Sequence, residues 1–412
     1  MIFNLSTKTT KLAAEIAISG SKSESNRLLI LQQLIDGLEI ENVSDSDDSK
    51  YLEKALITSD ELINIGHAGT AMRFLTSYFS IQKNREIVLT GSERMQNRPI
   101  EILVKALQDL GADISYEDKF GYPPIRIKGT DLVKDKVQIN GNVSSQYISS
   151  LLLIASSLPN GLEIELLGEI TSVPYINMTL SLLEKLGIET EFIANKITVK
   201  SFKNSTPKKI VVESDWSSAS YFYSLIALSE IDSEIKISSY KKDSLQGDSC
   251  LAEIYQHFGV NTVFEENLIL IRKTNVISSK VEKSHLKIDL KNAPDIAQTI
   301  AVTCFGLGVS CDLSGLHTLK IKETDRLVAL ENELTKLGGI ISVTDDSLHL
   351  NASTKIKENI AIETYNDHRM AMAFAPLALK VPITILDANV VTKSYRNFWN
   401  DMQQIGFQID SK

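Results

Sequence analysis

The sequence of 412 residues has few cysteines, no excess of basic residues and no long hydrophobic run. Its three cysteines, Cys250, Cys304 and Cys311, lack the spacing of a metal site, and an odd number of thiols argues against a disulfide framework. We therefore interpret them as buried apolar side chains and expect a reducing, cytoplasmic environment. The net charge of -9 excludes a broadly basic nucleic-acid surface.

Membrane and cofactor signals are also missing. No run approaches the ~18 apolar residues of a membrane helix, and the N-terminus lacks the hydrophobic region of a signal peptide. The sequence has no metal-ligand cluster and no dinucleotide fingerprint, so we predict no metal, no cofactor and no membrane or nucleic-acid partner. With 43% hydrophobic residues, a chain of this length predicts a globular protein of two domains.

A repeated pattern runs along the chain. An amphipathic helix ends in an apolar residue followed by glycine, and an alternating strand comes next. The glycines are 68 to 79 residues apart, and each is predicted to form a left-handed helix C-cap. They are Gly111, Gly187, Gly259, Gly338 and Gly406.

A sixth copy is expected near residue 40, but there the Leu-Gly pair and the following strand are missing. Strand and helix signals between the glycines make each unit mixed α and β. Five full units and one shortened unit predict two domains of three units, with a boundary near Glu213. We expect the shortening, at about 49–65, to remove a strand and a helix.

Polar helix starts mark the first half of the sequence. Lys22 and Arg27 follow a glycine–serine turn, where helix amides and full charges attract an anion. A capped surface helix with two solvated cations is the alternative. Gly69 opens a second helix, in which Arg73 is expected to make a structural salt bridge. A third helix opens with Ser144, Ser145 and Gln146.

Charged helix starts mark the second half. Lys322, Glu323 and Arg326 open a predicted helix, where an i,i+3 ion pair is the alternative role of these charges. Asp367 is an N-cap candidate, and Asp295 follows a proline at a helix start, where an N-cap is again the alternative. The buried stripe of the first of these helices is predicted to be Leu327, Leu330, Leu334 and Leu337.

Together these starts favour ligands rich in phosphate and carboxylate, which planar arginines bind bidentately. As a set, they resemble the 5-enolpyruvylshikimate-3-phosphate synthases, the 3-phosphoshikimate 1-carboxyvinyltransferases. The similar motifs run in the same order from Ser19 to Lys393: "GSKSESNR", "AGTAMR", "RMQNRP", "VSSQ", "SVPYI", "SSASYF", "QGD", "PDIAQTIA", "KETDR", "YNDHRMAM" and "TKSY".

The resemblance implies an α/β (α+β) fold of two similar domains, each of three βαβαββ units, with one unit of the first domain shortened. It implies a first domain at 20–212, a second at 1–19 and 213–412, and an active site in the cleft between them. The implied enzyme moves the enolpyruvyl group of phosphoenolpyruvate to the 5-hydroxyl of shikimate 3-phosphate. This transferase reaction releases phosphate on the shikimate pathway to chorismate and aromatic amino acids. A cytoplasmic monomer is expected.

The resemblance also implies site residues. Asp295 and Glu323 would act as general acid and base, with Lys22 beside them, and which proton each moves stays open. His368 would support the site. Phosphoenolpyruvate would contact Lys22, Gly69, Arg98, Gln146, Arg326, Arg369 and Lys393. Shikimate 3-phosphate would contact Lys22, Ser23, Arg27, Ser144, Ser145, Gln146, Ser172, Tyr175, Asp295 and Lys322.

Some positions depart from the family pattern. His67 and Phe74 stand where the family usually has Asn and Pro, so the response to glyphosate does not follow from the resemblance. One alternative is UDP-N-acetylglucosamine enolpyruvyl transferase, but that family carries a reactive cysteine in its first domain and this chain has none before Cys250. Another is a protein that binds phosphorylated metabolites without turnover, which the presence of Asp295 and Glu323 disfavours.

Overall fold

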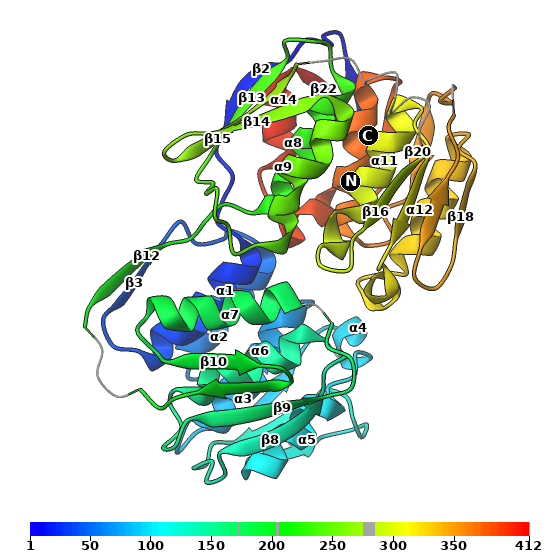
Figure 1. The fold of residues 1–412 in the computed structure, drawn as a ribbon. Helices are drawn as coiled ribbons and strands as arrows, with labels where there is room; N and C mark the ends of the chain where they lie inside the picture. Colours follow the sequence, from blue (N-terminus) through cyan, green and yellow to red (C-terminus); the bar gives the residue numbers. More distant parts are fainter. Residues whose placement is uncertain (143, 172, 203–205, 275–284, 354, 412) are drawn as a thin grey trace. The chain divides into compact units, whose positions relative to one another are not determined.

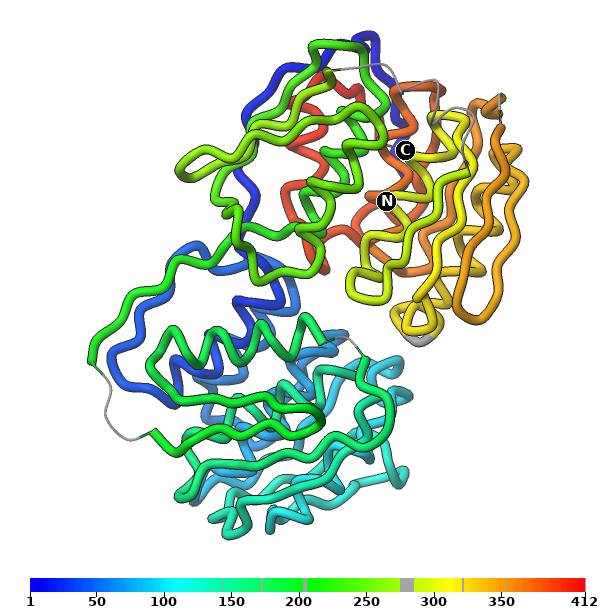
Figure 2. The backbone as a smooth tube through the Cα atoms, viewed as in Figure 1, coloured from blue at the N-terminus to red at the C-terminus, as the bar shows by residue number. Residues whose placement is uncertain are grey.

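The computed structural model describes the chain except for residues 143, 172, 203–205, 275–284, 354 and 412 and the side chain of Ile321. It consists of two compact units. Unit 1 contains residues 1–19 and 213–412, and unit 2 contains residues 20–212. The chain therefore passes from one unit to the other after Ser19 and again after Val212 (Figure 2).

Each four-stranded sheet follows one plan, shown first by unit 2 (Figure 1). Strands β4 (Leu62–Asn64) and β5 (Glu86–Thr90) are parallel. β7 (Ile125–Lys128) joins β5 antiparallel, and β6 (Asp113–Tyr116) pairs with β7 at the edge. The second sheet repeats this order with β8 (Lys136–Asn140), β9 (Leu162–Leu167), β11 (Lys196–Val199) and β10 (Thr190–Ile193).

Unit 1 has three sheets of the same plan in its described part. The first contains β2 (Ala13–Ile16), β13 (Glu234–Ser238), β15 (Leu268–Lys273) and β14 (Val260–Phe264). The second contains β16 (Leu286–Asp289), β17 (Cys311–Ser314), β19 (Leu348–Leu350) and β18 (Ile341–Val343). The third contains β20 (Ile360–Ile362), β21 (Ile383–Ile385), β1 (Phe3–Thr7) and β22 (Phe407–Ser411).

The shortened copy is a two-stranded sheet in unit 2. β3 (Leu38–Glu41) and β12 (Lys208–Val211) form its parallel pair. Helix α2 (Asp47–Ile57) follows β3 and leads directly to β4, so no antiparallel pair follows it in the described residues. The shortening is confirmed, but the expected loss of a helix is wrong. The deletion removes an edge hairpin and keeps the helix.

The five glycines of the repeat end helices as predicted. Their φ angles lie between 74° and 113°, in the left-handed region that favours glycine. An edge strand begins within three residues of each. The helices that they end are α5 (Glu101–Leu110), α7 (Val173–Lys185), η2 (Tyr255–Phe258), α12 (Arg326–Lys336) and α14 (Phe398–Ile405).

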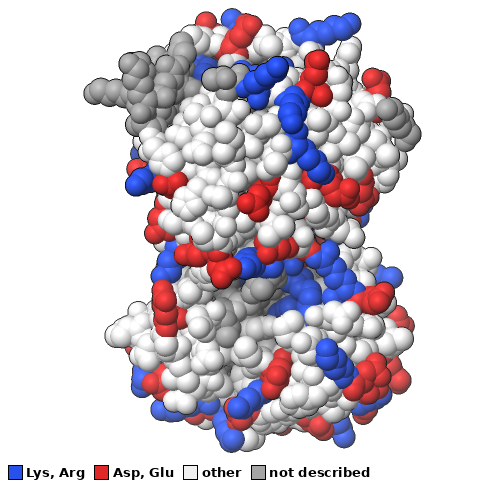
Figure 3. Space-filling model, turned by 90° about the vertical axis from the view of Figure 1, so that its right-hand side faces the viewer, with Lys and Arg blue, Asp and Glu red and all other residues white. Residues whose placement is uncertain are grey.

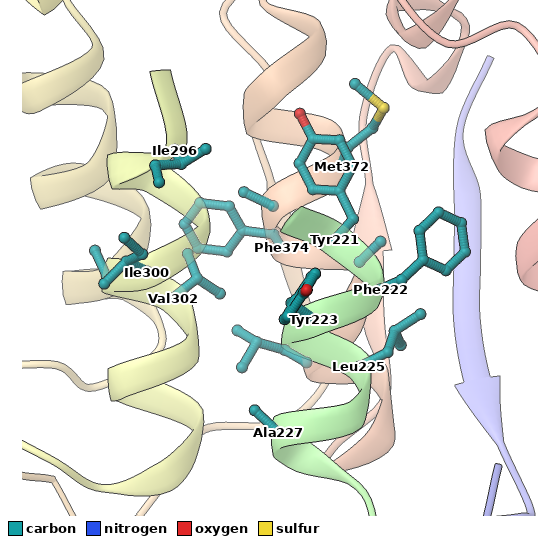
Figure 4. Packing of buried hydrophobic residues seen from close by; sticks show 14 of the residues in the cluster. Tyr221, Phe222, Tyr223, Leu225, Ala227, Ile296, Ile300, Val302, Met372 and Phe374 are labelled. Atoms are coloured by element: carbon teal, nitrogen blue, oxygen red, sulfur yellow. The ribbon is translucent and has the colours of Figure 1, made fainter. Parts of the chain in front are cut away.

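Three helices form the centre of each unit. In unit 2, α1 (Lys22–Leu34), α3 (Gly69–Ser80) and α6 (Ser145–Ala155) pack against one another. In unit 1 these are α8 (Trp216–Leu228), α11 (Ala297–Leu307) and α13 (His368–Phe374), whose apolar side chains interlock in Figure 4. All residues of α3, and all of α8 except Ser217, are buried, because both helices are covered on nearly every side.

Short helices complete the described chain: α4 (Glu93–Gln96), η1 (Gly247–Cys250), α9 (Leu251–Ile254), η3 (Pro294–Ile296), η4 (His317–Ile321), η5 (Ala375–Leu379) and η6 (Ala388–Lys393). Among the helices outside the undescribed segments, none is both long and apolar enough to cross a bilayer. Figure 3 shows both acidic and basic side chains on one face of the molecule.

Candidate active site

The start of α1 holds a buried arginine. Ser21 caps the helix by accepting a hydrogen bond from the Glu24 amide at 3.4 Å. One turn on, Arg27 donates from Nη1 to the Ser23 carbonyl at 2.7 Å. Arg27 is 2% exposed, so the alternative of a solvated cation is wrong for this residue. Its other donors reach Thr179 Oγ1 at 2.7 Å, Ser149 Oγ at 2.9 Å and the Tyr175 carbonyl at 3.2 Å.

These acceptors of Arg27 are all neutral. Burial lowers the pKa of Arg27 to about 10, and Tyr175 and Glu24 offset this only in part. Its guanidinium carbon also lies 5.5 Å from the ring centre of Phe74, a cation–π contact that a proline at this position would not provide. In the part of the chain that the structure describes, Arg27 makes no ion pair with a carboxylate.

The start of α3 brings Gly69 and Arg98 together. A Cβ on Gly69 would lie 2.5 Å from Arg98 Nη1, so only glycine lets the guanidinium come this close. α3 has no side-chain N-cap, which leaves its first amides to another acceptor. Tyr51 and Asp47 of α2 contact His67 just before this turn, the ring centres of Tyr51 and His67 being 5.8 Å apart.

Arg73 lies one turn into α3. It donates from Nη1 to the Gly69 carbonyl at 3.0 Å and from Nη2 to the Pro99 carbonyl at 3.4 Å. Burial and then the charge of Arg98 lower the pKa of Arg73 to about 10. The expected salt bridge is wrong, since no carboxylate among the described residues lies within ion-pair distance of Arg73.

The start of α6 joins this group. Ser144 caps the helix through the amide of Gln146 at 3.4 Å, and Gln146 Nε2 donates to Thr70 Oγ1 of α3 at 3.3 Å. Ser145 follows Ser144 and is 8% exposed. Unit 2 therefore gathers helix amides, hydroxyls and guanidinium groups with little carboxylate beside them. Ser172 lies outside the described residues.

Unit 1 surrounds one arginine with three carboxylates. Arg326 donates from Nε to Asp367 Oδ2 at 2.7 Å, from Nη1 to Asp295 Oδ1 at 2.9 Å and from Nη2 to Glu323 Oε2 at 2.7 Å. The contact with Glu323 confirms the expected i,i+3 ion pair. The leucine stripe of α12 is also confirmed, since Leu327, Leu330, Leu334 and Leu337 are at most 1% exposed. That stripe anchors the helix whose first residue is Arg326.

Asp295 lies between three cations. Besides Arg326, it accepts from Arg369 Nη2 at 3.2 Å and lies 3.5 Å from Lys322 Nζ. The N-cap alternative is wrong, because α11 has no side-chain cap and the Asp295 carboxylate turns to these cations instead. Asp367 does cap α13 as predicted, accepting from the amide of Arg369 at 2.8 Å.

The arginines of unit 1 respond to these carboxylates. Burial alone would lower the pKa of Arg326, but Asp367, Glu323 and Asp295 together raise it above its ordinary value. The pKa of Arg369 is likewise lowered by burial and raised more strongly by Asp295 and other neighbours. Both arginines are thus held charged, although they are buried.

Two further residues of this cluster were missed from the sequence. Ser217 donates to Asp248 Oδ2 and accepts from Arg369 Nη2 at 3.2 Å. Burial and then the charge of Asp295 raise the pKa of Asp248 to about 6. Both lie within motifs of the resemblance, "SSASYF" and "QGD", but no local pattern showed that they would meet.

Lys393 lies beside the segment that enters α13. Its Nζ donates to the carbonyl of Asn366 at 2.6 Å. His368 is 2% exposed and lies next to Asp367, with 3.7 Å between Nδ1 and Oδ1. The structure therefore places Asp295, Lys322, Glu323, Arg326 and Arg369 in one cluster of ion pairs in unit 1, while Lys393 binds the carbonyl of Asn366, next to Asp367.

The carboxylates of this cluster differ in access. The side chain of Glu323 is 27% exposed and that of Asp295 is 13% exposed, whereas Asp367 is fully buried. Glu323 and Asp295 are therefore the more accessible carboxylates of the cluster, while Asp367 pairs with Arg326 in the interior. Within the described ranges, no group of three or more His, Cys, Asp and Glu side chains is arranged to bind a metal ion.

A family model described as EPSP synthase (3-phosphoshikimate 1-carboxyvinyltransferase) matches residues 51–402. The chain belongs to the EPSP synthase family. It is 43% identical over 404 residues to the 3-phosphoshikimate 1-carboxyvinyltransferase of Bacteroides fragilis, covering 97% of both chains. The Haemophilus influenzae relative of that name is 36% identical over 423 residues, covering 95% of this chain and 96% of the relative.

Solved structures share the fold of this EPSP synthase family member. EPSP synthase from Acinetobacter baumannii superimposes with a TM-score of 0.82 at 20% identity, covering 100% of both chains. The enolpyruvyl transferase NikO from Streptomyces tendae gives 0.75 at 13% identity, covering 99% of this chain and 98% of the other. The predicted fold class and family are thereby confirmed.

Proposed function

We propose that this chain transfers the enolpyruvyl group of phosphoenolpyruvate to the 5-hydroxyl of shikimate 3-phosphate and releases inorganic phosphate. The observation that carries the proposal is the cluster in which Asp295 and Glu323 share the guanidinium of Arg326, in a chain of this family. Two partly accessible carboxylates beside fixed cations suit a reaction that needs both proton transfer and anion binding.

Shikimate 3-phosphate would be held mainly by unit 2. The uncompensated charge of Arg27 and the polar starts of α1 and α6 support this assignment, because an oxyanion there meets donors without displacing a carboxylate. Asp295 and Lys322 would contact its hydroxyl groups and charges. The full proposed set is Lys22, Ser23, Arg27, Ser144, Ser145, Gln146, Ser172, Tyr175, Asp295 and Lys322.

Phosphoenolpyruvate would contact guanidinium and ammonium groups of both units. The close approach of Arg98 to Gly69 supports one part of this set, and the buried Arg326 and Arg369 support another. Three arginines suit a ligand with a phosphate and a carboxylate, since each group can be bound bidentately. The full proposed set is Lys22, Gly69, Arg98, Gln146, Arg326, Arg369 and Lys393.

The chemistry requires one acid and one base. C3 of the enol gains a proton as the 5-hydroxyl oxygen attacks C2 and loses its own proton, giving a tetrahedral intermediate. C3 then loses a proton as the C2–phosphate oxygen bond breaks and phosphate leaves. Glu323 and Asp295 are proposed for these transfers, with Lys22 stabilising charge at the reacting oxygens. Arg326 would hold both carboxylates in place.

Release of phosphate from phosphoenolpyruvate tests the function. We expect rapid release with shikimate 3-phosphate, and little without an acceptor or with UDP-N-acetylglucosamine, together with an enolpyruvyl product detected by mass spectrometry. Release with UDP-N-acetylglucosamine alone would favour the related transferase. Binding of shikimate 3-phosphate by calorimetry without any release would favour a protein that binds these metabolites without turnover.

We also propose that the enzyme is a monomer and works in the cytoplasm. The odd number of thiols supports a reducing, cytoplasmic environment, and a monomer is what the family resemblance implies. Light scattering after size exclusion would give about 46 kDa if the chain is monomeric, since its mass is 45.7 kDa. A mass of twice that value would contradict the monomer.

A further inference from the structure

Glu333 is a fully buried carboxylate that the proposed reaction does not use. It lies on α12, seven residues after Arg326, which is two helical turns along the same face. A buried carboxylate requires compensating donors. Lys336, one turn on, supplies a charged one, with its Nζ at 2.7 Å and 2.9 Å from the two carboxylate oxygens.

The other donors to Glu333 come from the segment that leads into α13. The amide of Glu363 donates to Oε2 at 3.1 Å, and the hydroxyl of Tyr365 donates to Oε1 at 2.6 Å. Because Arg326 binds Asp367 at 2.7 Å, one face of α12 holds residues 363–367 at both ends. These residues connect β20 to α13.

The held segment has an unfavourable backbone. Tyr365 and Asn366 are consecutive non-glycine residues in the left-handed region, with φ angles of 52° and 59°. Such conformations persist only when surrounding contacts enforce them, and they concentrate at functional sites. Here two hydrogen bonds hold the turn in place: the Tyr365 hydroxyl donates to Glu333, and the Asp367 carboxylate accepts from Arg326.

The left-handed turn determines where two site residues lie. It directs the carbonyl of Asn366 to Lys393 Nζ at 2.6 Å. It also places Asp367 to cap α13 at the amide of Arg369, at 2.8 Å. A change in the turn would thus move Lys393 and Arg369 together, while the cluster at Arg27 in unit 2 has no part in it.

We propose that Glu333 is a positioning residue, which acts through Tyr365 and the left-handed turn to place Lys393 and Arg369 for phosphoenolpyruvate. This inference rests on the proposed function, since it takes those two residues as contacts of phosphoenolpyruvate. It adds Glu333 and Tyr365 as residues that act on that substrate without touching it.

Replacing Tyr365 with Phe tests the proposal, because only the hydroxyl that reaches Glu333 is lost. We expect the KM for phosphoenolpyruvate to rise about tenfold, the usual effect of losing a hydrogen bond to a charged group. The KM for shikimate 3-phosphate should change less than twofold. E333Q should likewise raise the KM for phosphoenolpyruvate and leave the KM for shikimate 3-phosphate nearly unchanged. Adding Asn366→Gly to Tyr365→Phe should recover part of the loss, because glycine adopts φ near 59° without strain.

Tyr223→Phe is the matched control. It removes another tyrosine hydroxyl of unit 1, which lies 2.8 Å from Thr262 Oγ1, and it should leave both KM values unchanged. If Tyr365→Phe behaved like this control, or raised both KM values equally, Glu333 would have only a structural role and the proposal would be overturned. A wild-type protein without activity on the two substrates would overturn the proposed function as well.

Discussion

The two units hold their buried arginines in opposite ways. Arg27 of unit 2 and Arg326 of unit 1 are each 2% exposed. Arg27 donates to hydroxyl and carbonyl oxygens, and its pKa falls to about 10, whereas Arg326 donates to three carboxylates, and its pKa rises. A buried cation without a counterion gains most from a bound anion, while a neutralised one gains little. We infer that Arg27 would gain more from a bound anion than Arg326, whose guanidinium mainly holds the carboxylates proposed for proton transfer.

The largest expected effect is a loss of turnover, and it tests the proposed role of a unit 1 carboxylate in proton transfer. Glu323→Gln keeps the size of the side chain and an acceptor for Arg326, but it removes the group that exchanges a proton. Turnover should fall about a thousandfold, within the range for loss of a general acid or base, with substrate binding and fold nearly unchanged. Phosphate release and calorimetry measure the two effects.

Glu331→Gln on α12, the helix that follows Glu323, is the control for that variant. Glu331 is half-buried and lies outside the cluster around Arg326, so its replacement should leave turnover within twofold. Near-normal turnover in Glu323→Gln would remove Glu323 from proton transfer and weaken the distinction between the units.

A second test compares the arginines directly. Arg326→Met leaves three carboxylates together without their shared cation and should destabilise unit 1 by about 3–5 kcal/mol. Arg27→Met should cost unit 2 only about 1 kcal/mol, because Thr179 and Ser149 keep other hydrogen bonds and an unpaired buried charge is removed. Urea unfolding followed by unit-specific tryptic cleavage measures both. Equal losses would contradict the contrast drawn above.

The smallest effect concerns pH. Burial and Asp295 raise the pKa of Asp248 from 3.8 to about 6, so its contribution to stability is present below pH 4 and is lost as the pH rises through 6. Asp248→Asn cannot ionise and should be about 1–3 kcal/mol more stable than wild type at pH 7.5, with no gain at pH 3.5. Urea midpoints at the two pH values measure this.

The exposed Asp243→Asn serves as the control for Asp248→Asn. It should leave the pH dependence of stability as in wild type. If both variants, or neither, were more stable than wild type at pH 7.5, the ionised Asp248 carboxylate would not destabilise this cluster.

Local features of the fold followed from the sequence. The glycine C-caps, the leucine stripe of α12, the start of α6 at Ser144 and the N-cap at Asp367 depend on residues within one or two helical turns of each other. Helix periodicity and capping depend on residues this close in the sequence, so the sequence alone can predict them. The predicted ligand contacts and catalytic residues, which lie far apart in the sequence, came from the family resemblance.

Long-range partners could not be predicted in the same way. Asp295 had an equally good local role as an N-cap, and only the position of Arg326, 31 residues later, shows where its carboxylate points. Arg73 was expected in an ion pair but lies among carbonyl groups and a thioether sulfur. The loss of a helix was wrongly expected near α2 because the missing hairpin also removes the Leu-Gly signal that ends the other helices.

The pairing of β1 has a consequence for biosynthesis. Phe3 to Thr7 form a central strand between β21 and β22, which contain residues 383–385 and 407–411. On the ribosome this strand is made long before β21 and β22, so it waits for its neighbours while the residues between them are synthesised. Unit 2 is continuous from Gly20 to Val212, so it can fold during that wait. Unit 1 can complete its fold only after unit 2 has been made, because β1 must pair with strands that are translated several hundred codons later.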